Sequence, residues 1–147
     1  MSAATKAAAR ENFLPLMREL VRAYQAFAAY DASGYRDANL TVAQADVIFA
    51  LGNTEGLTFK EIGESTLITK GTLTGVVDRL EAKGLVKRVA YDDDRRCTRV
   101  TLTAKGNAVF EKEFPRQIDY MKERFDRLSA ADQKAALRSL RKIRELF

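Results

Sequence analysis

The chain of 147 residues contains no histidine and a single cysteine, Cys97. Without histidine, the Ser/His and Cys/His pairs of nucleophilic enzymes and histidine metal sites cannot be built. One cysteine cannot form an internal disulfide framework. The glycines are not spaced as in a phosphate-binding loop. The sequence therefore predicts a protein that is not an enzyme and that uses no metal and no cofactor.

Long apolar runs are missing as well. No segment is apolar over the roughly 20 residues that a membrane helix needs, and the alanine-rich start of the chain lacks the apolar stretch of a signal peptide. We therefore expect a cytoplasmic protein that does not associate with membranes. The length fits one domain, 1–147, and 25 Lys and Arg against 20 Asp and Glu give a net charge of +5, which suits nucleic acid without proving it.

The segment after Thr69 predicts a helix with two contrasting faces. A helical period places four apolar residues on one stripe: Leu73, Val76, Val77 and Leu80. The opposite face carries Lys70, Gly71, Thr72, Thr74, Gly75, Asp78 and Arg79. Each glycine costs a helix about 1 kcal/mol relative to alanine, so this face is not built for helix stability. Small residues allow close approach, and threonine and lysine can meet phosphates and base edges. The alternative is a surface helix of weak propensity.

The residues around this helix predict a helix-turn-helix over about 58–83. Thr58 and Glu61 form a capping box that starts a short helix ending near Ser65. Thr69 can be the N-cap of the next helix, which leaves that helix N-terminus free to face a phosphate. Gly84 suits a left-handed position that ends the second helix.

Two alternating runs follow and predict a β-hairpin, or wing, over about 85–103. Its turn holds Asp94, Arg95 and Arg96. Paired arginines at the tip of a ribbon are attracted by a narrow, negative minor groove, and Asp94 would orient an arginine, since phosphate repels a carboxylate. The alternative is a solvated hairpin.

The run from Leu40 to Gly106 resembles the MarR family of bacterial transcription regulators. The resemblance rests on LTVAQADVIFAL, TFKEIGEST, ITKGTLTGVVDRLEAKGLV and DDDRRCTRVTLTAKG, in the family's order and spacing. Ala90 and Tyr91 stand where a proline and an aspartate are common in the family, which leaves the angle of the hairpin open. The implied fold class is mainly α with a small two- or three-stranded β-wing: a winged helix-turn-helix core at 40–106 and dimerisation helices at 5–35 and 104–147.

The resemblance implies that the outward face of the second helix enters the major groove of double-stranded DNA and that Arg95 or Arg96 enters the minor groove. It also implies an obligate homodimer on a pseudo-palindromic operator, often with a small aromatic or phenolic effector that lowers DNA affinity. Together with the residue patterns, it gives these DNA-binding residues: Thr69, Lys70, Gly71, Thr72, Thr74, Arg79, Asp94, Arg95 and Arg96.

Both ends of the chain carry apolar residues at helical spacing. The stripes are Phe13, Leu16, Met17, Leu20, Tyr24 and Phe27; Phe110, Phe114, Ile118, Met121, Phe125 and Leu128; and Leu137, Leu140, Ile143 and Phe147. They exceed what one small wing domain can cover, which favours packing between subunits over an enlarged monomer core.

The functional prediction is a ligand-responsive, dimeric regulator that represses by occupying its operator. The layout places an effector pocket where the dimerisation helices meet the wing domain, with possible lining by Phe13, Arg18, Arg22, Tyr24 and Phe49. Two alternatives stay open. One is a winged-helix interaction or adaptor module that does not bind DNA. The other is a redox-responsive regulator in which neighbouring arginines stabilise a Cys97 thiolate, although Cys97 is equally suited to be a packed small residue.

Overall fold

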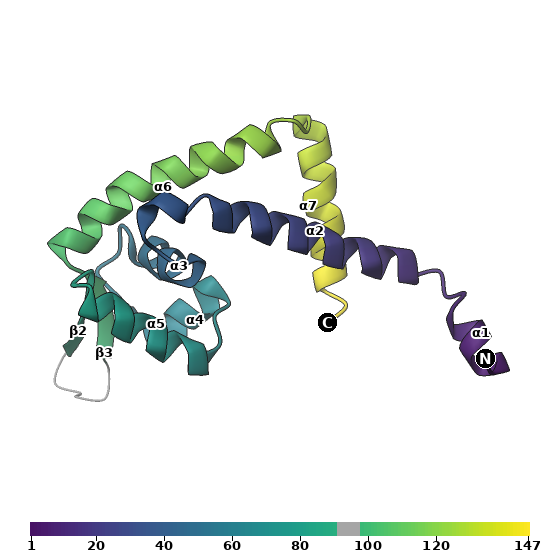
Figure 1. Cartoon of the computed structure of the whole chain (residues 1–147), viewed down its shortest axis with the longest axis horizontal. Coiled ribbons are helices and arrows are strands. Elements are labelled where there is room, and N and C mark those ends of the chain that lie inside the picture. The colour runs from purple at the N-terminus through teal and green to yellow at the C-terminus, as the bar shows by residue number, and fades with distance from the viewer. Residues whose placement is uncertain (91–97) are drawn as a thin grey trace.

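The computed structural model describes residues 1–90 and 98–147, and most of them are helical. The elements are α1 (Ala3–Ala8), α2 (Leu14–Ser33), the short 3-10 helix η1 (Arg36–Ala38), α3 (Val42–Leu51), β1 (Leu57–Thr58), α4 (Phe59–Thr66), α5 (Lys70–Ala82), β2 (Val86–Ala90), β3 (Thr98–Leu102), α6 (Ala104–Phe125) and α7 (Ala130–Arg144). The helices α3, α4 and α5 and the small sheet form one body, from which α2, α6 and α7 extend (Figure 1). The predicted fold class, mainly α with a small β-wing, is confirmed.

The sheet has three antiparallel strands in the order β1-β3-β2. Two of them are the predicted strands of the wing, and Arg88 of β2 lies opposite Val100 of β3. The third, β1, is two residues long and pairs Leu57 with Val100. Because β1 runs directly into α4, the sheet ties the start of the helix-turn-helix to the wing.

Local signals place the two helices of the helix-turn-helix as predicted. The backbone N–H of Thr58 donates to Glu61 Oε2 over 2.7 Å, and the N–H of Glu61 donates to Thr58 Oγ1 over 3.3 Å, so the capping box forms. The Glu61 carboxylate accepts from both the backbone N–H and the hydroxyl of Thr58, and these two hydrogen bonds lower its pKa. Gly84 takes the predicted left-handed conformation, with φ +69°. The turn between α4 and α5 also contains a left-handed residue, Leu67 (φ +60°), which the sequence pattern did not indicate.

The core lies between α3, α4, α5, the sheet and the start of α6. Its buried residues are Val47, Ile48, Leu51, Ile62, Leu73, Val76, Val77, Leu80, Leu85, Val86, Val100 and Phe110. The whole predicted apolar stripe of α5 is among them, so the predicted helical phase is right. This core therefore determines which face of α5 remains outside.

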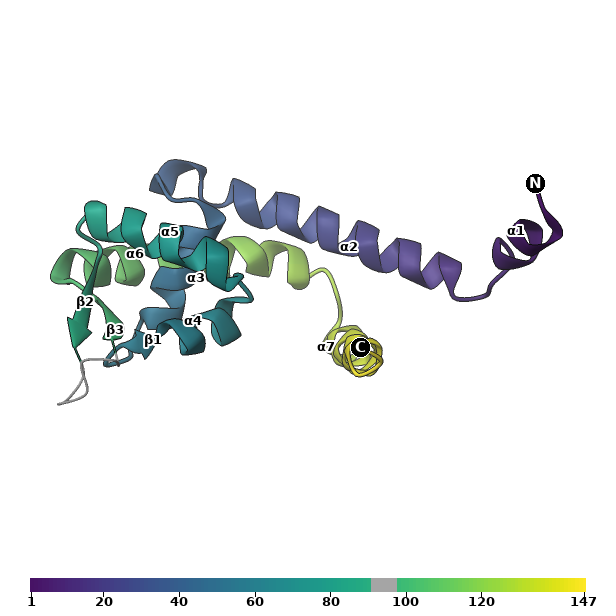
Figure 2. The same ribbon diagram turned by 90° about the horizontal axis from the view of Figure 1, so that it is seen from below.

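The terminal helices are only partly covered. The C-terminal part of α2 packs on α6, where the rings of Tyr30 and Tyr120 stack with centroids 4.3 Å apart. The rest of α2 and all of α7 stand away from the body, as the two perpendicular views show (Figures 1 and 2). Neither α2 nor α7 contains a buried residue. Within the described part of the chain, no helix is long and apolar enough to cross a membrane.

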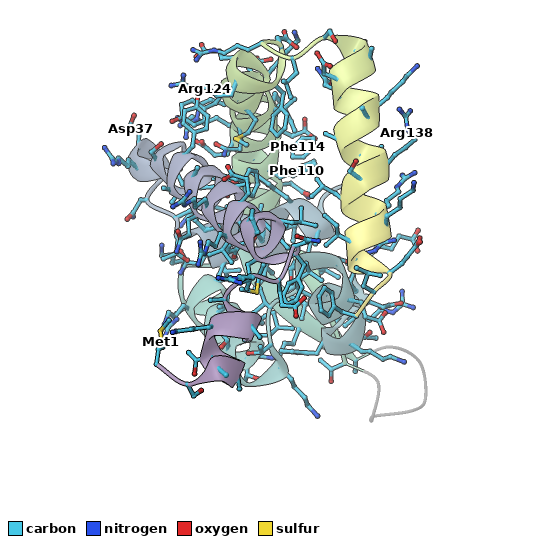
Figure 3. The ribbon with its side chains drawn as sticks, turned by 90° about the vertical axis from the view of Figure 1, so that its right-hand side faces the viewer. Met1, Asp37, Phe110, Phe114, Arg124 and Arg138 are labelled. Atoms are coloured by element: carbon cyan, nitrogen blue, oxygen red, sulfur yellow. The ribbon has the colours of Figure 1, made fainter. Side chains whose placement is uncertain are left out.

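Most of the predicted apolar stripes on these helices face solvent in the single chain. Exposed members are Phe13, Leu16, Met17, Tyr24, Phe27, Phe114, Ile118, Phe125, Leu128, Leu137, Leu140 and Phe147. The side view shows the opposite, polar side of α7, where Arg138 points outward, while Phe110 and Phe114 lie toward the middle of the molecule (Figure 3). An enlarged core of one chain therefore does not account for the stripes.

Candidate nucleic-acid interface

The outward face of α5 is the candidate interface. Lys70, Gly71, Thr72, Thr74 and Arg79 are exposed, as predicted, on the side opposite the buried stripe. Because the stripe is fixed in the core, these side chains cannot rotate inward without breaking the domain. The helix therefore presents a fixed row of short polar and cationic groups to whatever lies outside.

The N-terminus of α5 is open toward solvent. Thr69 has the extended backbone of an N-cap residue, with φ −64° and ψ 148°, but its side chain makes no hydrogen bond to the amides of the first turn. Its hydroxyl instead donates to Thr72 Oγ1 over 3.1 Å. No side chain therefore caps the positive end of the helix dipole, which is the arrangement that favours a phosphate oxygen.

Packing among the described residues does not explain the glycines on this face. A Cβ built on Gly71 meets none of their atoms within 4 Å, and one built on Gly75 meets only Arg79 Nη2 at 3.9 Å. By contrast, a Cβ on Gly106 in α6 would lie 1.9 Å from the carbonyl oxygen of Leu85. Gly106 is therefore needed by the fold, whereas Gly71 and Gly75 weaken α5 without a packing reason of this kind. Close approach of an external surface is a reason for both.

One residue of this region was not predicted from the sequence. Arg88, on β2, forms ion pairs with Asp78 and Glu81 of α5. Asp78 was predicted to belong to the polar face of the helix, and the structure shows that it points to the wing strand. No periodicity links a position on a helix to one on the strand that follows it, so only the fold brings Asp78 and Arg88 together.

The predicted wing residues Asp94, Arg95 and Arg96, and the candidate redox residue Cys97, lie outside the described residues. Their flanking strands are described: β2 ends at Ala90 and β3 begins at Thr98. The roles predicted for these four residues remain predictions from the sequence.

The end of α2 is joined to α6 through a polar junction. Gln117 Nε2 donates to Asp31 Oδ1 over 2.8 Å, and Arg116 Nη2 donates to the carbonyl oxygen of Gly34 over 2.9 Å. A Cβ on Gly34 would lie 2.2 Å from Gln117 Oε1, so the helices approach this closely because residue 34 has no side chain. The junction holds α2, which belongs to the expected dimerisation region, in a fixed position relative to the body.

Two ionisable groups at this junction have shifted pKa values. Burial, and then the charge of Asp31, raise the pKa of Asp46 to about 6. Burial, followed by the charges of Asp31 and Asp46, also raises the pKa of Tyr35. The partial burial of Asp46 and the nearby charge of Asp31 therefore oppose the ionisation of this side chain.

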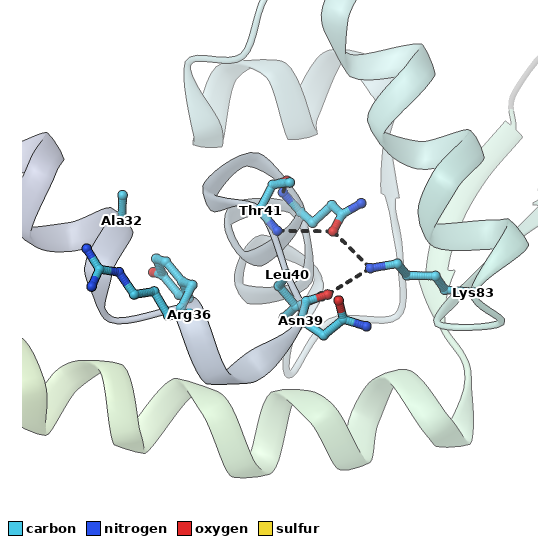
Figure 4. A pocket seen from close by; sticks show the side chains of 8 residues that line it. Ala32, Arg36, Asn39, Leu40, Thr41 and Lys83 are labelled. Carbon is cyan, nitrogen blue, oxygen red and sulfur yellow. Dashed lines mark hydrogen bonds between the residues drawn. The ribbon is translucent and has the colours of Figure 1, made fainter.

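A hollow of about 390 Å³ lies beside this junction (Figure 4). It is lined by Ala32, Tyr35, Arg36, Asn39, Leu40, Thr41, Gln44 and Lys83. Lys83 Nζ donates to the carbonyl oxygen of Asn39 over 2.8 Å and lies 3.3 Å from Gln44 Oε1 (Figure 4). The hollow thus connects the start of α3 with the end of α5 and has two cationic residues in its lining.

The residues suggested as effector lining do not come together in the single chain. Phe49 packs in an aromatic cluster, with its ring centroid 5.2 Å from Phe114 and 6.4 Å from Phe110. It also lines a smaller hollow of about 270 Å³ beside Asp46. Phe13, Arg18, Arg22 and Tyr24 are exposed on α2 and at its start.

Comparison with known proteins identifies the family. The model of the MarR family matches residues 38–96, the region that holds α3, α4, α5 and β2. A solved structure of BpsR from Bordetella bronchiseptica is 31% identical, with a TM-score of 0.79, over 90% of this chain and 95% of that chain. The chain belongs to the MarR family. The resemblance that the sequence motifs indicated is thereby confirmed.

Two further relatives extend the comparison. The MarR family regulator Sco3205 from Streptomyces coelicolor, solved in complex with DNA, has a TM-score of 0.80 and 25% identity over 88% of this chain and 84% of that chain. The HTH-type transcriptional regulator SarZ from Staphylococcus aureus (strain MRSA252) is 35% identical over 74 residues, which are 50% of each protein. This MarR chain spans about half the length of the curated relatives it matches.

If Gly71 allows close approach to DNA, Gly71→Ala should have opposite effects on stability and on binding. The substitution should raise the free energy of unfolding, by up to about 1 kcal/mol, because alanine is the better helix former and its Cβ meets none of the described residues. It should weaken binding to duplex DNA several-fold, because the added methyl group blocks close approach. Denaturant unfolding and fluorescence anisotropy measure the two effects.

Asn107→Ala provides the control, because Asn107 is exposed on α6. It should raise helix stability and leave DNA binding unchanged. Equal DNA affinity of Gly71→Ala and the wild type would show that the glycine is not there for close approach.

The raised pKa of Asp46 predicts a pH-dependent stability. The folded state holds the Asp46 proton up to a pKa of about 6, against an ordinary value of 3.8, so the wild type loses stability as the pH rises through this window. Asp46→Asn removes that loss and should be more stable than the wild type at neutral pH, by about 1 kcal/mol after allowance for solvent screening. The two proteins should converge near the lower end of the window.

Thermal unfolding across this pH range measures the difference. Asp37→Asn removes an exposed carboxylate of η1 and serves as the control, with no expected change. A stability difference between Asp46→Asn and the wild type that is the same at all pH values would contradict the assigned cause.

Proposed function

We propose that this MarR protein is a DNA-binding transcriptional regulator, that α5 reads the major groove, and that the protein represses by occupying its operator. The observation that carries the proposal is the outward face of α5. It combines an open helix N-terminus, short polar side chains and two glycines that no contact with the described residues requires. A phosphate backbone and base edges are the surface that these features fit together.

The relatives support the same function. Sco3205 was solved in complex with DNA, and BpsR is a protein whose DNA binding is regulated by 6-hydroxynicotinic acid. We extend both properties to this chain, including Arg95 and Arg96 as the minor-groove contacts of the wing. We propose accordingly that the protein acts in the cytoplasm, regulates transcription and has no catalytic activity.

The protein is proposed to act as a homodimer. The apolar sides of α2, α6 and α7 are exposed in one chain, as at Leu16, Ile118 and Leu140, which are each more than half exposed at 53%, 51% and 53%. Covering the exposed half of each such side chain is worth about 0.8–1.5 kcal/mol. A second copy supplies the surface that covers these stripes and also places a second α5 for the other half of a palindromic site.

For the effector we propose a small aromatic acid. The hollow of Figure 4 has Arg36 at one end and Lys83 at the other, either of which can meet a carboxylate, with Tyr35 and Leu40 between them for a ring. It lies where α2 joins α3, so an occupant there contacts both the dimerisation region and the helix-turn-helix. Its binding is therefore able to change the angle between them.

Selection of duplexes from a random-sequence library by the wild-type protein tests the function. We expect a pseudo-palindromic sequence to be enriched. Thr72→Ala and Thr74→Ala should each reduce the preference for the selected duplex over a scrambled one, by about 1–3 kcal/mol where the threonine touches a base, and leave the melting temperature nearly unchanged.

The wing is tested by Arg95→Ala with Arg96→Ala. This variant should bind both the selected and the scrambled duplex more weakly, because the charges that attract the phosphate backbone are removed. The slope of log affinity against log salt should also become shallower, by about 0.9 for each phosphate that the arginines neutralise in the wild type. An unchanged affinity and slope would remove the wing from the mechanism.

Thr5→Ala, in the exposed helix α1, is the matched control for Thr72→Ala and Thr74→Ala and should bind DNA like the wild type. Enrichment of no duplex would refute the proposed function and favour an adaptor module. Addition of 6-hydroxynicotinic acid to the wild type tests the effector class, with lower affinity for the selected duplex as the expected result.

The dimer is tested by charges placed on the exposed stripe of α7. Leu137→Glu with Leu140→Glu should produce monomers, because the carboxylates would be buried in the interface, while the monomer fold should persist because both positions are exposed. Arg138→Glu, on the outward side of the same helix (Figure 3), should remain dimeric. Sedimentation at micromolar concentration decides, and a monomeric wild type would refute the dimer.

A further inference from the structure

Arg88 of β2 contacts both helices of the helix-turn-helix. Its Nη2 donates to Asp78 Oδ1 over 2.5 Å, and its Nη1 donates to Glu81 Oε2. Its guanidinium carbon lies 5.6 Å from the centre of the ring of Phe59, the first residue of α4. One side chain therefore joins the wing strand to α5 through two charged hydrogen bonds and to α4 through a cation–π contact.

We call the contacts of Arg88 with Asp78 and Glu81 the Arg88 clamp. The two carboxylates are well placed to bind one guanidinium group. Asp78 and Glu81 are three residues apart on α5, so they project from adjacent turns of the same side of the helix. The planar guanidinium has several N–H groups in a fixed fork and can bind both at once, which fixes its orientation as well as its position. The side chain of Arg88 is 29% exposed, whereas the carboxylates are 59% and 42% exposed, so the arginine is the covered partner.

The position of Arg88 in β2 explains how the clamp affects the orientation of the wing. Arg88 is two residues before Ala90, where β2 ends on the way to the tip of the wing. Backbone pairing with β3 holds β2 within the sheet, and Arg88 adds a side-chain link from this end of β2 to the polar side of α5. Because this end of β2 is held against α5, the angle between the wing and α5 is set.

We propose that Arg88 is a positioning residue for DNA reading: its bonds to Asp78 and Glu81 fix the wing relative to α5, so that both elements meet the same duplex in register. This inference rests on the proposed DNA-binding function. Arg88 acts through the two elements it joins and does not itself read a base. A rigid relation between α5 and the wing favours the sequence for which both contacts fit, so its loss lowers discrimination more than overall affinity.

The test measures the ratio of affinities for the duplex selected by the wild type and for a scrambled duplex. Arg88→Gln should reduce this ratio about tenfold. Arg88→Lys keeps the charge but loses the fork, and should restore the ratio only in part. Lys87→Gln removes the same charge from the adjacent, exposed position of β2 and should weaken both duplexes alike, with the ratio unchanged.

The decisive variant is Asp78→Asn with Glu81→Gln, which leaves Arg88 in place. It removes two negative charges from a chain of net charge +5, so a purely electrostatic role predicts tighter binding to both duplexes. Positioning predicts a reduced ratio, as in Arg88→Gln, together with faster amide hydrogen exchange at Val89 in the absence of DNA. Both variants should remain folded by circular dichroism, since the clamp is at the surface.

The outcomes distinguish the role of Arg88 from the DNA-binding function. A wild type that enriches a duplex, with variants that keep the wild-type ratio, would overturn the role of Arg88 alone. A wild type that enriches no duplex would overturn the DNA-binding function and with it this role. Tighter binding of Asp78→Asn with Glu81→Gln at an unchanged ratio would show that Arg88 only neutralises the two carboxylates.

Discussion

Burial of the apolar stripe of α5 is the constraint on which the interface depends. Leu73, Val76, Val77 and Leu80 are at most 2% exposed, and full burial of such side chains contributes about 1.5–3 kcal/mol each. That energy is comparable to the whole stability of a typical domain, so the helix cannot rotate about its axis. The outward orientation of the polar face of α5 follows from the burial of this stripe. The glycines on it are tolerated because the other side of the helix holds it in place, although they lower its intrinsic propensity.

A second constraint lies at the polar junction where α2 ends. Gly34 lets α2 approach Gln117 of α6, and the stacked rings of Tyr30 and Tyr120 continue the contact along both helices. Backbone and side-chain hydrogen bonds here have specific directions, which apolar contacts lack, so the junction fixes an angle as well as a distance. The half-buried acid Asp46 lies on α3, the α-helix that follows. The body that carries α5 is therefore held to the terminal helices by contacts that small changes in charge can alter.

The sequence predicts those parts of the fold that depend on neighbours along the chain. The Thr58 and Glu61 capping box, the stripe of α5 and Gly84 are each set by residues a few positions apart, and all are confirmed. Features that depend on distant pairing were missed. The two-residue strand β1 is too short to show a pattern, and the Arg88 clamp needs the wing to fold back on α5. The exposed faces of α5 and α7 could be predicted for the same local reason, whereas the cavity beside Lys83 depends on three segments meeting in space.

The terminal helices give the separation of the two reading helices in the proposed dimer. Two α5 helices must lie about 34 Å apart to enter successive major grooves on one side of a duplex. Since the exposed stripes of α2, α6 and α7 are the proposed contact between subunits, that separation is set by the angle at which each body leaves α2. A small rotation at the junction produces a larger displacement of α5, because α5 lies at a distance from the axis of rotation. Thus an occupant of the neighbouring hollow needs to favour only a slightly different angle, by a few kcal/mol, to move both helices out of register with their half-sites at once.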